Sequence, residues 1–62
     1  MIQVNDIVLT KDNRFAVVEQ MAWLPYRGSG RWVAGVRMSD CDDSLAIVAT
    51  GLRLWLRPPL SD

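Results

Sequence analysis

The apolar residues of this chain come in short runs separated by polar residues, glycine or proline, and this spacing constrains the fold more than any other feature. No stretch shows the i, i+3, i+4, i+7 apolar pattern of an amphipathic helix between an N-cap and a C-cap. The runs instead have the length and the β-branched or aromatic content of strands. The sequence predicts five strands, at residues 4–10, 15–23, 31–38, 45–50 and 52–57.

The connections between these runs predict antiparallel pairing. The Lys-Asp-Asn-Arg turn at residues 11–14 contains side chains that bond the local backbone, so the first two runs are expected to form a hairpin. Residues 24–30 are expected to form a longer loop, because Pro25 lacks a backbone donor and two nearby glycines make the chain flexible. Residues 39–44 form a second polar turn, and Gly51 separates the last two runs.

The small size of the chain limits how it can be stabilised. It has 62 residues, one cysteine and no histidine, which indicates one domain over residues 1–62 without an internal disulfide. Residues 58–62 are expected to fray, because two consecutive prolines stop strand pairing. Apolar burial barely offsets chain entropy at this length. We therefore expect a dense core, with which a content of three tryptophans is consistent because each can bury a large area, and self-association or a protein partner as further support.

Composition also bears on the compartment. Half of the residues are apolar, and seven basic side chains balance seven acidic ones, which excludes a disordered chain. The longest apolar run, residues 45–49, is too short to span a membrane, and the first residues lack the pattern of a signal peptide. A single cysteine is typical of a reducing compartment. We expect a cytoplasmic protein with no membrane contact.

The first third of the chain resembles a known fold family. Residues 4–10 (Val-Asn-Asp-Ile-Val-Leu-Thr), a polar turn and residues 15–19 (Phe-Ala-Val-Val-Glu) resemble the opening hairpin of SH3-like barrels, such as the KOW and Tudor-like groups. Those families often begin with Gly-Asp-x-Val, and here Asn5 stands in place of the glycine. The resemblance implies an all-β fold, a single small five-stranded antiparallel SH3-like barrel. Closing the sheet would remove its exposed edges.

The residue types do not favour an enzyme. Without histidine, the chain lacks the commonest general base and metal ligand. The acidic cluster of Asp40, Asp42 and Asp43 lacks the glycine and the distal glutamate of a calcium loop, so it is interpreted as a solvated turn. Cys41 has no base to activate it. The SH3-like type II dihydrofolate reductases have a strand with the sequence Val-Gln-Ile-Tyr. The segment at residues 52–55 contains neither the Gln nor the Tyr of that strand. We expect no catalysis, no cofactor and no metal.

The last predicted strand alternates leucine with arginine or tryptophan. Strand geometry places these two sets on opposite faces. The leucines are expected to face the core: Leu52, Leu54 and Leu56. The outward stripe is then Arg53, Trp55 and Arg57. Three interpretations of this stripe remain open: a platform on which an unpaired base stacks, a hot spot for a protein partner, or a tryptophan that packs on its own chain beneath the arginine stems.

The predicted loop and its flanks form a second candidate site. Its aromatic and basic residues are Trp23, Tyr26, Arg27, Arg31 and Trp32. In SH3-like barrels, the loop between the second and third strands often lines the ligand groove, and these residue types suit a peptide or a base. The alternative is structural, with Trp23 and Trp32 opposed across a hairpin and packed on each other.

These observations predict a small non-enzymatic binding module. Small neutral barrels are common products of phages and mobile elements, which is an association and not an inference from these residues. The module would dock a protein partner, or a second copy of itself, through an exposed surface of arginine and aromatic side chains. Binding of single-stranded RNA or DNA by stacking is the alternative, although zero net charge counts against it. The predicted surface consists of Trp23, Tyr26, Arg27, Arg31, Trp32, Arg53, Trp55 and Arg57.

Overall fold

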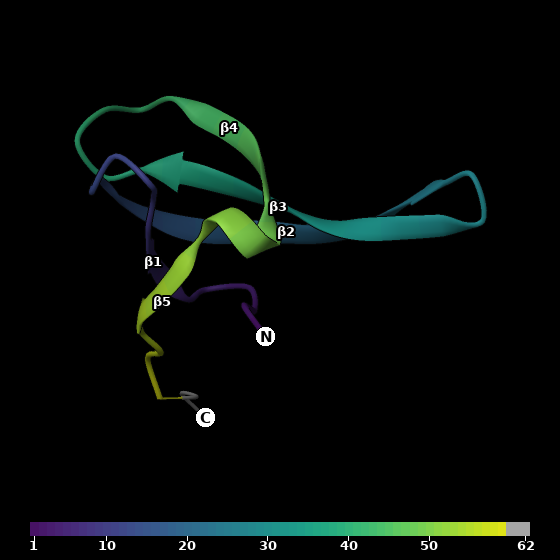
Figure 1. Cartoon of the computed structure of the whole chain (residues 1–62). Helices are drawn as coiled ribbons and strands as arrows, with labels where there is room; N and C mark the ends of the chain where they lie inside the picture. Colours follow the sequence, from purple (N-terminus) through teal and green to yellow (C-terminus); the bar gives the residue numbers. More distant parts are fainter. Residues whose placement is uncertain (60–62) are drawn as a thin grey trace.

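The computed structural model describes residues 1–59, which form one five-stranded antiparallel sheet (Figure 1). The strands are β1 (Ile7–Leu9), β2 (Phe15–Tyr26), β3 (Ser29–Met38), β4 (Ser44–Val48) and β5 (Arg53–Leu56). A short 3-10 helix, η1 (Ala49–Gly51), joins β4 to β5. These residues contain no α-helix, and nothing in them is helical and apolar over the length that a membrane crossing requires. The predictions of an all-β fold and of five antiparallel strands are confirmed.

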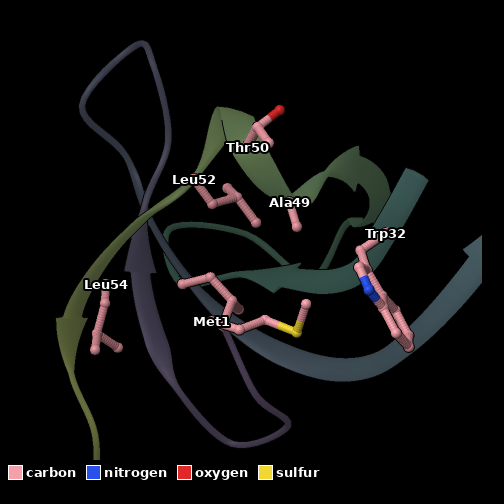
Figure 2. A pocket seen from close by; sticks show the side chains of 7 residues that line it. Met1, Trp32, Ala49, Thr50, Leu52 and Leu54 are labelled. Atoms are coloured by element: carbon pink, nitrogen blue, oxygen red, sulfur yellow. The ribbon is translucent and has the colours of Figure 1, made fainter. Parts of the chain in front are cut away.

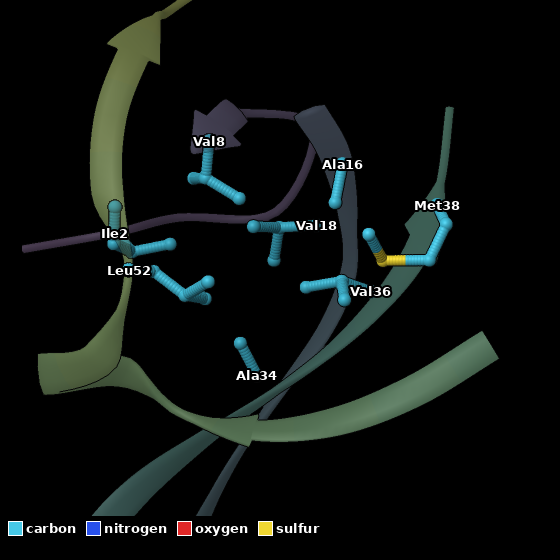
Figure 3. Close-up of a cluster of buried hydrophobic side chains, with 8 residues drawn as sticks. All are labelled: Ile2, Val8, Ala16, Val18, Ala34, Val36, Met38 and Leu52. Atoms are coloured by element: carbon cyan, nitrogen blue, oxygen red, sulfur yellow. The ribbon is translucent and has the colours of Figure 1, made fainter. Parts of the chain in front are cut away.

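The sheet is open, so a closed barrel is not confirmed. The strand order is β4-β3-β2-β1-β5, with β4 and β5 as the two edges. Irregularities in pairing occur between Val18 and Gln20 and between Ile7 and Val8. Such bulges bend strands and increase their twist. The strands consequently curl around the buried side chains, as Figure 3 shows.

The prediction of a loop at residues 24–30 is wrong. β2 continues to Tyr26, β3 begins at Ser29, and only Arg27 and Gly28 lie between them. Both have positive φ, 47° and 77°, as a two-residue type I′ hairpin turn requires. Pro25 fits this strand because β1 pairs with β2 only as far as Val17, which makes the rest of β2 an edge that tolerates proline.

The outer half of the β2–β3 hairpin therefore forms a two-stranded arm. Residues 23–26 of β2 pair with residues 29–32 of β3, whereas β4 reaches only Val33. The arm extends away from the rest of the sheet (Figure 1). Ribbons of two strands are marginally stable in water on their own, so contacts of the arm side chains matter for its structure.

The hydrophobic core is aliphatic, and the three tryptophans lie outside it. The phenylalanine, the tyrosine and the three tryptophans expose between 37% and 62% of their surface. The inward positions of the short strands carry valine, alanine and methionine, whereas the aromatic residues fall on the arm or on the outer face. The buried side chains are Ile2, Val8, Ala16, Val18, Ala34, Val36, Met38 and Leu52 (Figure 3).

The first predicted strand is shorter than expected because residues 3–6 form a turn. The Asp6 N–H donates to the Gln3 carbonyl at 3.1 Å, and Asn5 has a φ of 76°. Asparagine is one of the few residues other than glycine that adopt this left-handed conformation readily. The Asn5 N–H donates to the Val18 carbonyl at 2.7 Å, which joins the turn to β2.

A buried ion pair connects the two ends of the described chain. Asp6 is 1% exposed and accepts hydrogen bonds from Arg57 Nε at 3.0 Å and Nη2 at 2.9 Å. The Gln3 backbone N–H also donates to Asp6 at 2.7 Å, and Arg57 Nη2 donates to the Met1 carbonyl at 2.8 Å. The hydrogen bond from Arg57 lowers the pKa of Asp6 below its usual value near 3.8, although burial opposes this shift.

Removing Arg57 should destabilise the protein and make its stability less sensitive to acid. The ion pair stabilises the native chain fully above pH 3.8, and this contribution is lost as the pH falls through the lower pKa of folded Asp6. In Arg57→Ala the largest cause that lowers this pKa is removed, while burial still raises it and the Gln3 N–H still lowers it, so acidification should cost less stability than in the wild-type chain. We expect a loss of about 2–3 kcal/mol at neutral pH, since a buried carboxylate loses its partner while water reaches the site.

Urea unfolding between pH 3 and pH 7 (about the range in which carboxylates titrate) and NMR titration of Asp6 measure this effect. Arg37→Ala is the matched control, because Arg37 pairs with Glu19 at 2.6 Å while both side chains are exposed. The control should lose under about 1 kcal/mol. Equal losses in the two variants would contradict the role assigned to the buried pair.

Candidate functional site

The structure distributes the eight predicted surface residues over two faces of the sheet. Trp32 lies in the same alternating row of β3 as the buried residues Ala34 and Val36, so it extends the inner face. Trp55 lies on the outer face of β5, where its ring contacts Phe15 edge-on with centroids 5.2 Å apart. The arm and the β5 stripe thus do not form one continuous surface.

Two of the three residues of the predicted outward stripe are engaged within the chain. Arg57 forms the buried ion pair with Asp6. Arg53 Nη2 lies 3.4 Å from Asn13 Oδ1, which makes a weak hydrogen bond. Trp55 is 62% exposed, as the alternation predicts, although one edge packs on Phe15. The interaction that this side of the sheet can still offer a ligand is stacking on the free face of the Trp55 ring.

The prediction that Leu52, Leu54 and Leu56 are buried is wrong for two of them. Leu52 is 7% exposed and belongs to the core, but Leu54 and Leu56 expose 47% and 54% of their surface. Alternation determines the face of a strand on which a side chain lies, not whether another element covers it. β5 is an edge strand, and of these three leucines only Leu52 is covered by other described residues.

The arm presents two packed tryptophans on its inner face. Trp23 and Trp32 are cross-strand partners, with ring centroids 5.5 Å apart and planes at 66°. This confirms the structural interpretation of the pair. The Trp23 indole also lies directly over Gly30, where an added Cβ would come within 2.4 Å of the ring. Glycine is therefore required at position 30 for close approach of the ring to the backbone.

The tip of the arm combines arginine with aromatic and aliphatic side chains. The Arg27 guanidinium lies 5.5 Å from the centre of the Tyr26 ring, within range of a cation–π contact. Arg31 lines a shallow hollow of about 350 Å³ together with Leu24, Pro25 and Tyr26. Tyr26 and Leu24 are 62% and 52% exposed. The tip therefore offers positive charge beside apolar surface.

An apolar groove lies beside the arm on the inner face of the sheet. It encloses about 420 Å³, and Figure 2 shows Met1 in its middle, with Trp32 on one side and Leu54 on the other. Ile2 and Leu52 belong both to the groove and to the core. The groove is thus a continuation of the core that opens to solvent. Its lining residues are Met1, Ile2, Trp32, Ala49, Thr50, Leu52 and Leu54.

Trp32 is one of the predicted surface residues, but the groove that it lines was not predicted from the sequence. The period-2 row that links Trp32 to Ala34 and Val36 was the available signal, since it places the indole on the inner face. The contributions of Met1 and Ile2 carried no comparable signal, because the N-terminal segment reaches the groove through the turn at residues 3–6.

The acidic turn is held by an arginine from another hairpin. Arg14 donates to Asp40 through Nε at 2.9 Å and Nη2 at 2.8 Å, which lowers the pKa of that carboxyl. Arg14 Nη2 also lies 3.7 Å from Cys41 Sγ. Among the described residues, no three His, Cys, Asp or Glu side chains gather closely enough to hold a metal ion. The arrangement connects the β1–β2 turn to the β3–β4 turn.

Comparisons with known proteins add no functional assignment. The sequence matches no protein-family model, and neither curated proteins nor solved structures give a significant match. Any functional conclusion therefore depends on the surface just described.

Replacing Gly30 with alanine should disturb the tryptophan pair. The new methyl group would overlap the Trp23 indole and approach the Leu24 carbonyl oxygen to 2.9 Å, so the ring must leave its site. We expect a loss of about 1–2 kcal/mol, comparable to overpacking and the loss of an aromatic pair. Near-ultraviolet circular dichroism and urea unfolding measure the two effects.

Gly35→Ala in the same strand is the matched control. The nearest atom to its added Cβ is 3.7 Å away, an ordinary contact, so the tryptophan signal should persist. An unchanged tryptophan signal in Gly30→Ala would contradict the packing of Trp23 over the backbone.

Proposed function

We propose that this chain is a small non-enzymatic binding module that docks a protein surface on its inner side. The docking region, which we call the apolar face, consists of Met1, Trp23, Trp32 and Leu54. One observation supports it above all: these exposed side chains adjoin the core, and their exposed fractions lie between 37% and 78%. Soluble monomers rarely leave a contiguous apolar region of this kind without a function.

The residue types on the apolar face favour a protein partner. Tryptophan is enriched in the energetic centres of protein interfaces, where it fills pockets and excludes water. The groove supplies such a pocket, with aliphatic walls from Leu52 and Leu54 and the aromatic Trp32 at one end. Since the arm projects beyond the sheet, it can contact a partner from a second side (Figure 1).

The fold and the compartment belong to the same proposal. The open sheet represents an SH3-like fold that is curled without edge pairing, and the left-handed Asn5 in the opening turn supports this assignment. The exposed thiol of Cys41 supports residence in the reducing cytoplasm.

Capture experiments with matched leucine variants test the docking function. Leu54 and Leu45 are both on edge strands and are 47% and 45% exposed, but only Leu54 lines the groove. An immobilised wild-type chain and a Leu45→Asp variant should retain the same protein from a cell extract, whereas Leu54→Asp should lose about tenfold or more of it. Equal retention by all three chains would contradict the proposal, and so would a chain that retains no protein and does not associate with itself.

Nucleic-acid binding at the tip of the arm is the second candidate. Arg27 and Arg31 form no ion pair within the described residues, and they lie beside Tyr26. By contrast, Arg14, Arg37 and Arg57 are all paired with carboxylates, so contacts with phosphates would fall to the basic side chains without an ion pair within residues 1–59.

Titration with single-stranded RNA or DNA at low salt distinguishes the two candidates. If protein docking is the function, tryptophan fluorescence should show no saturable change at micromolar protein. Saturable quenching that Arg27→Gln with Arg31→Gln abolishes, and that Arg37→Gln leaves intact, would favour the nucleic-acid function instead.

A further inference from the structure

We infer that the partner of the apolar face is a second copy of this chain, in a two-fold symmetric dimer. This inference rests on the proposed docking function and names the partner. Three properties of the chain lead to it: how much surface it exposes, its extended shape, and the uncharged character of the groove.

The exposed surface is larger than a compact monomer requires. The chain exposes 4772 Å², whereas a monomer of its mass, 7.0 kDa, is expected to expose about 4,000 Å². The excess of about 700 Å² is close to the roughly 800 Å² that each partner buries in a standard protein interface. One interface on one face would therefore account for the surplus.

The shape of the chain identifies the elements involved. The radius of gyration is 11.9 Å, compared with about 10.6 Å expected for a compact domain of this length. The arm contributes to this extension because it lies beyond the pairing of β1 and β4 (Figure 1). A second copy against its inner face would cover Trp23 and Trp32.

The charge distribution permits two identical surfaces to meet. In a two-fold interface the same patch occurs on both sides, so it must be complementary to itself. A charged patch would repel its copy, whereas an apolar one would not. All seven residues that line the groove have uncharged side chains, and the chain has no net charge. The side chains of the groove and the net charge of the chain therefore do not oppose association.

The apolar face also has a shape that suits self-association. It contains a hollow of about 420 Å³ and, next to it, the protruding pair of Trp23 and Trp32. Two-fold symmetry brings the tryptophans of one copy toward the groove of the other, so both grooves fill at once. Arg31 lies in the opposite alternating row of β3 from Trp32, so its charge is kept off the apolar face.

Sedimentation equilibrium from micromolar to millimolar concentration tests the inference. The wild-type chain and Leu45→Asp should form dimers with closely similar dissociation constants. Leu54→Asp should weaken dimerisation by about tenfold or more, because it introduces a carboxylate into the groove of each copy. A wild-type chain that stays monomeric at millimolar concentration would overturn the inference, and so would equal weakening in both variants.

The indole N–H signals provide a second measurement that needs no variant. Dilution of the wild-type chain should shift the NMR signals of Trp23 and Trp32, which lie on the apolar face. Trp55 is on the outer face and should not shift, so it serves as an internal control. Concentration-dependent shifts confined to Trp55 would place the contact elsewhere and contradict the inference.

The inference and the proposed function can fail separately. A monomeric chain that captures a different protein in a Leu54-dependent manner would refute self-association and leave the docking function intact. A monomeric chain that captures nothing would refute both.

Discussion

The small aliphatic core is the constraint on which the rest of this structure depends. Within residues 1–59 eight hydrophobic side chains are buried, and none is larger than methionine, leucine or isoleucine. Aromatic side chains can each bury about 150–250 Å², so leaving all of them partly exposed forgoes much of the hydrophobic stabilisation that the composition offers. The chain therefore depends on polar contacts at its periphery, and its large apolar side chains remain available for contact with another molecule.

Two arginines form those polar contacts, and one of them, Arg57, is a predicted binding residue. Arg57 connects the end of β5 to the N-terminal turn through Asp6, and Arg14 connects two hairpin turns through Asp40. The first pair is buried on its acidic side, which makes it costly to break, whereas the second is exposed and contributes less. An arginine-rich composition is thus explained partly by folding, which weakens the case for nucleic acid.

Local patterns predicted the strands and polar turns because their causes are local. Asn13 in the first turn adopts the left-handed conformation that its residue type favours, and the alternation of residues 52–57 correctly placed Trp55 outward. The arm was missed because Pro25 and Gly30 normally interrupt strands. Here Pro25 lies on an unpaired edge, and Gly30 accommodates the Trp23 ring, so each residue has a tertiary reason that no local pattern contains.

The burial of the β5 leucines marks the limit of what alternation can predict. Leu54 points to the inner side, as expected, and lines the groove, yet almost half of its surface remains exposed. Whether such a residue is buried depends on which element lies over it, and within residues 1–59 no element covers Leu54 fully. The residues that a sequence marks for a core but a single chain leaves uncovered are those that a second chain can bury. Leu54 and Trp32 meet that description from opposite sides of one groove.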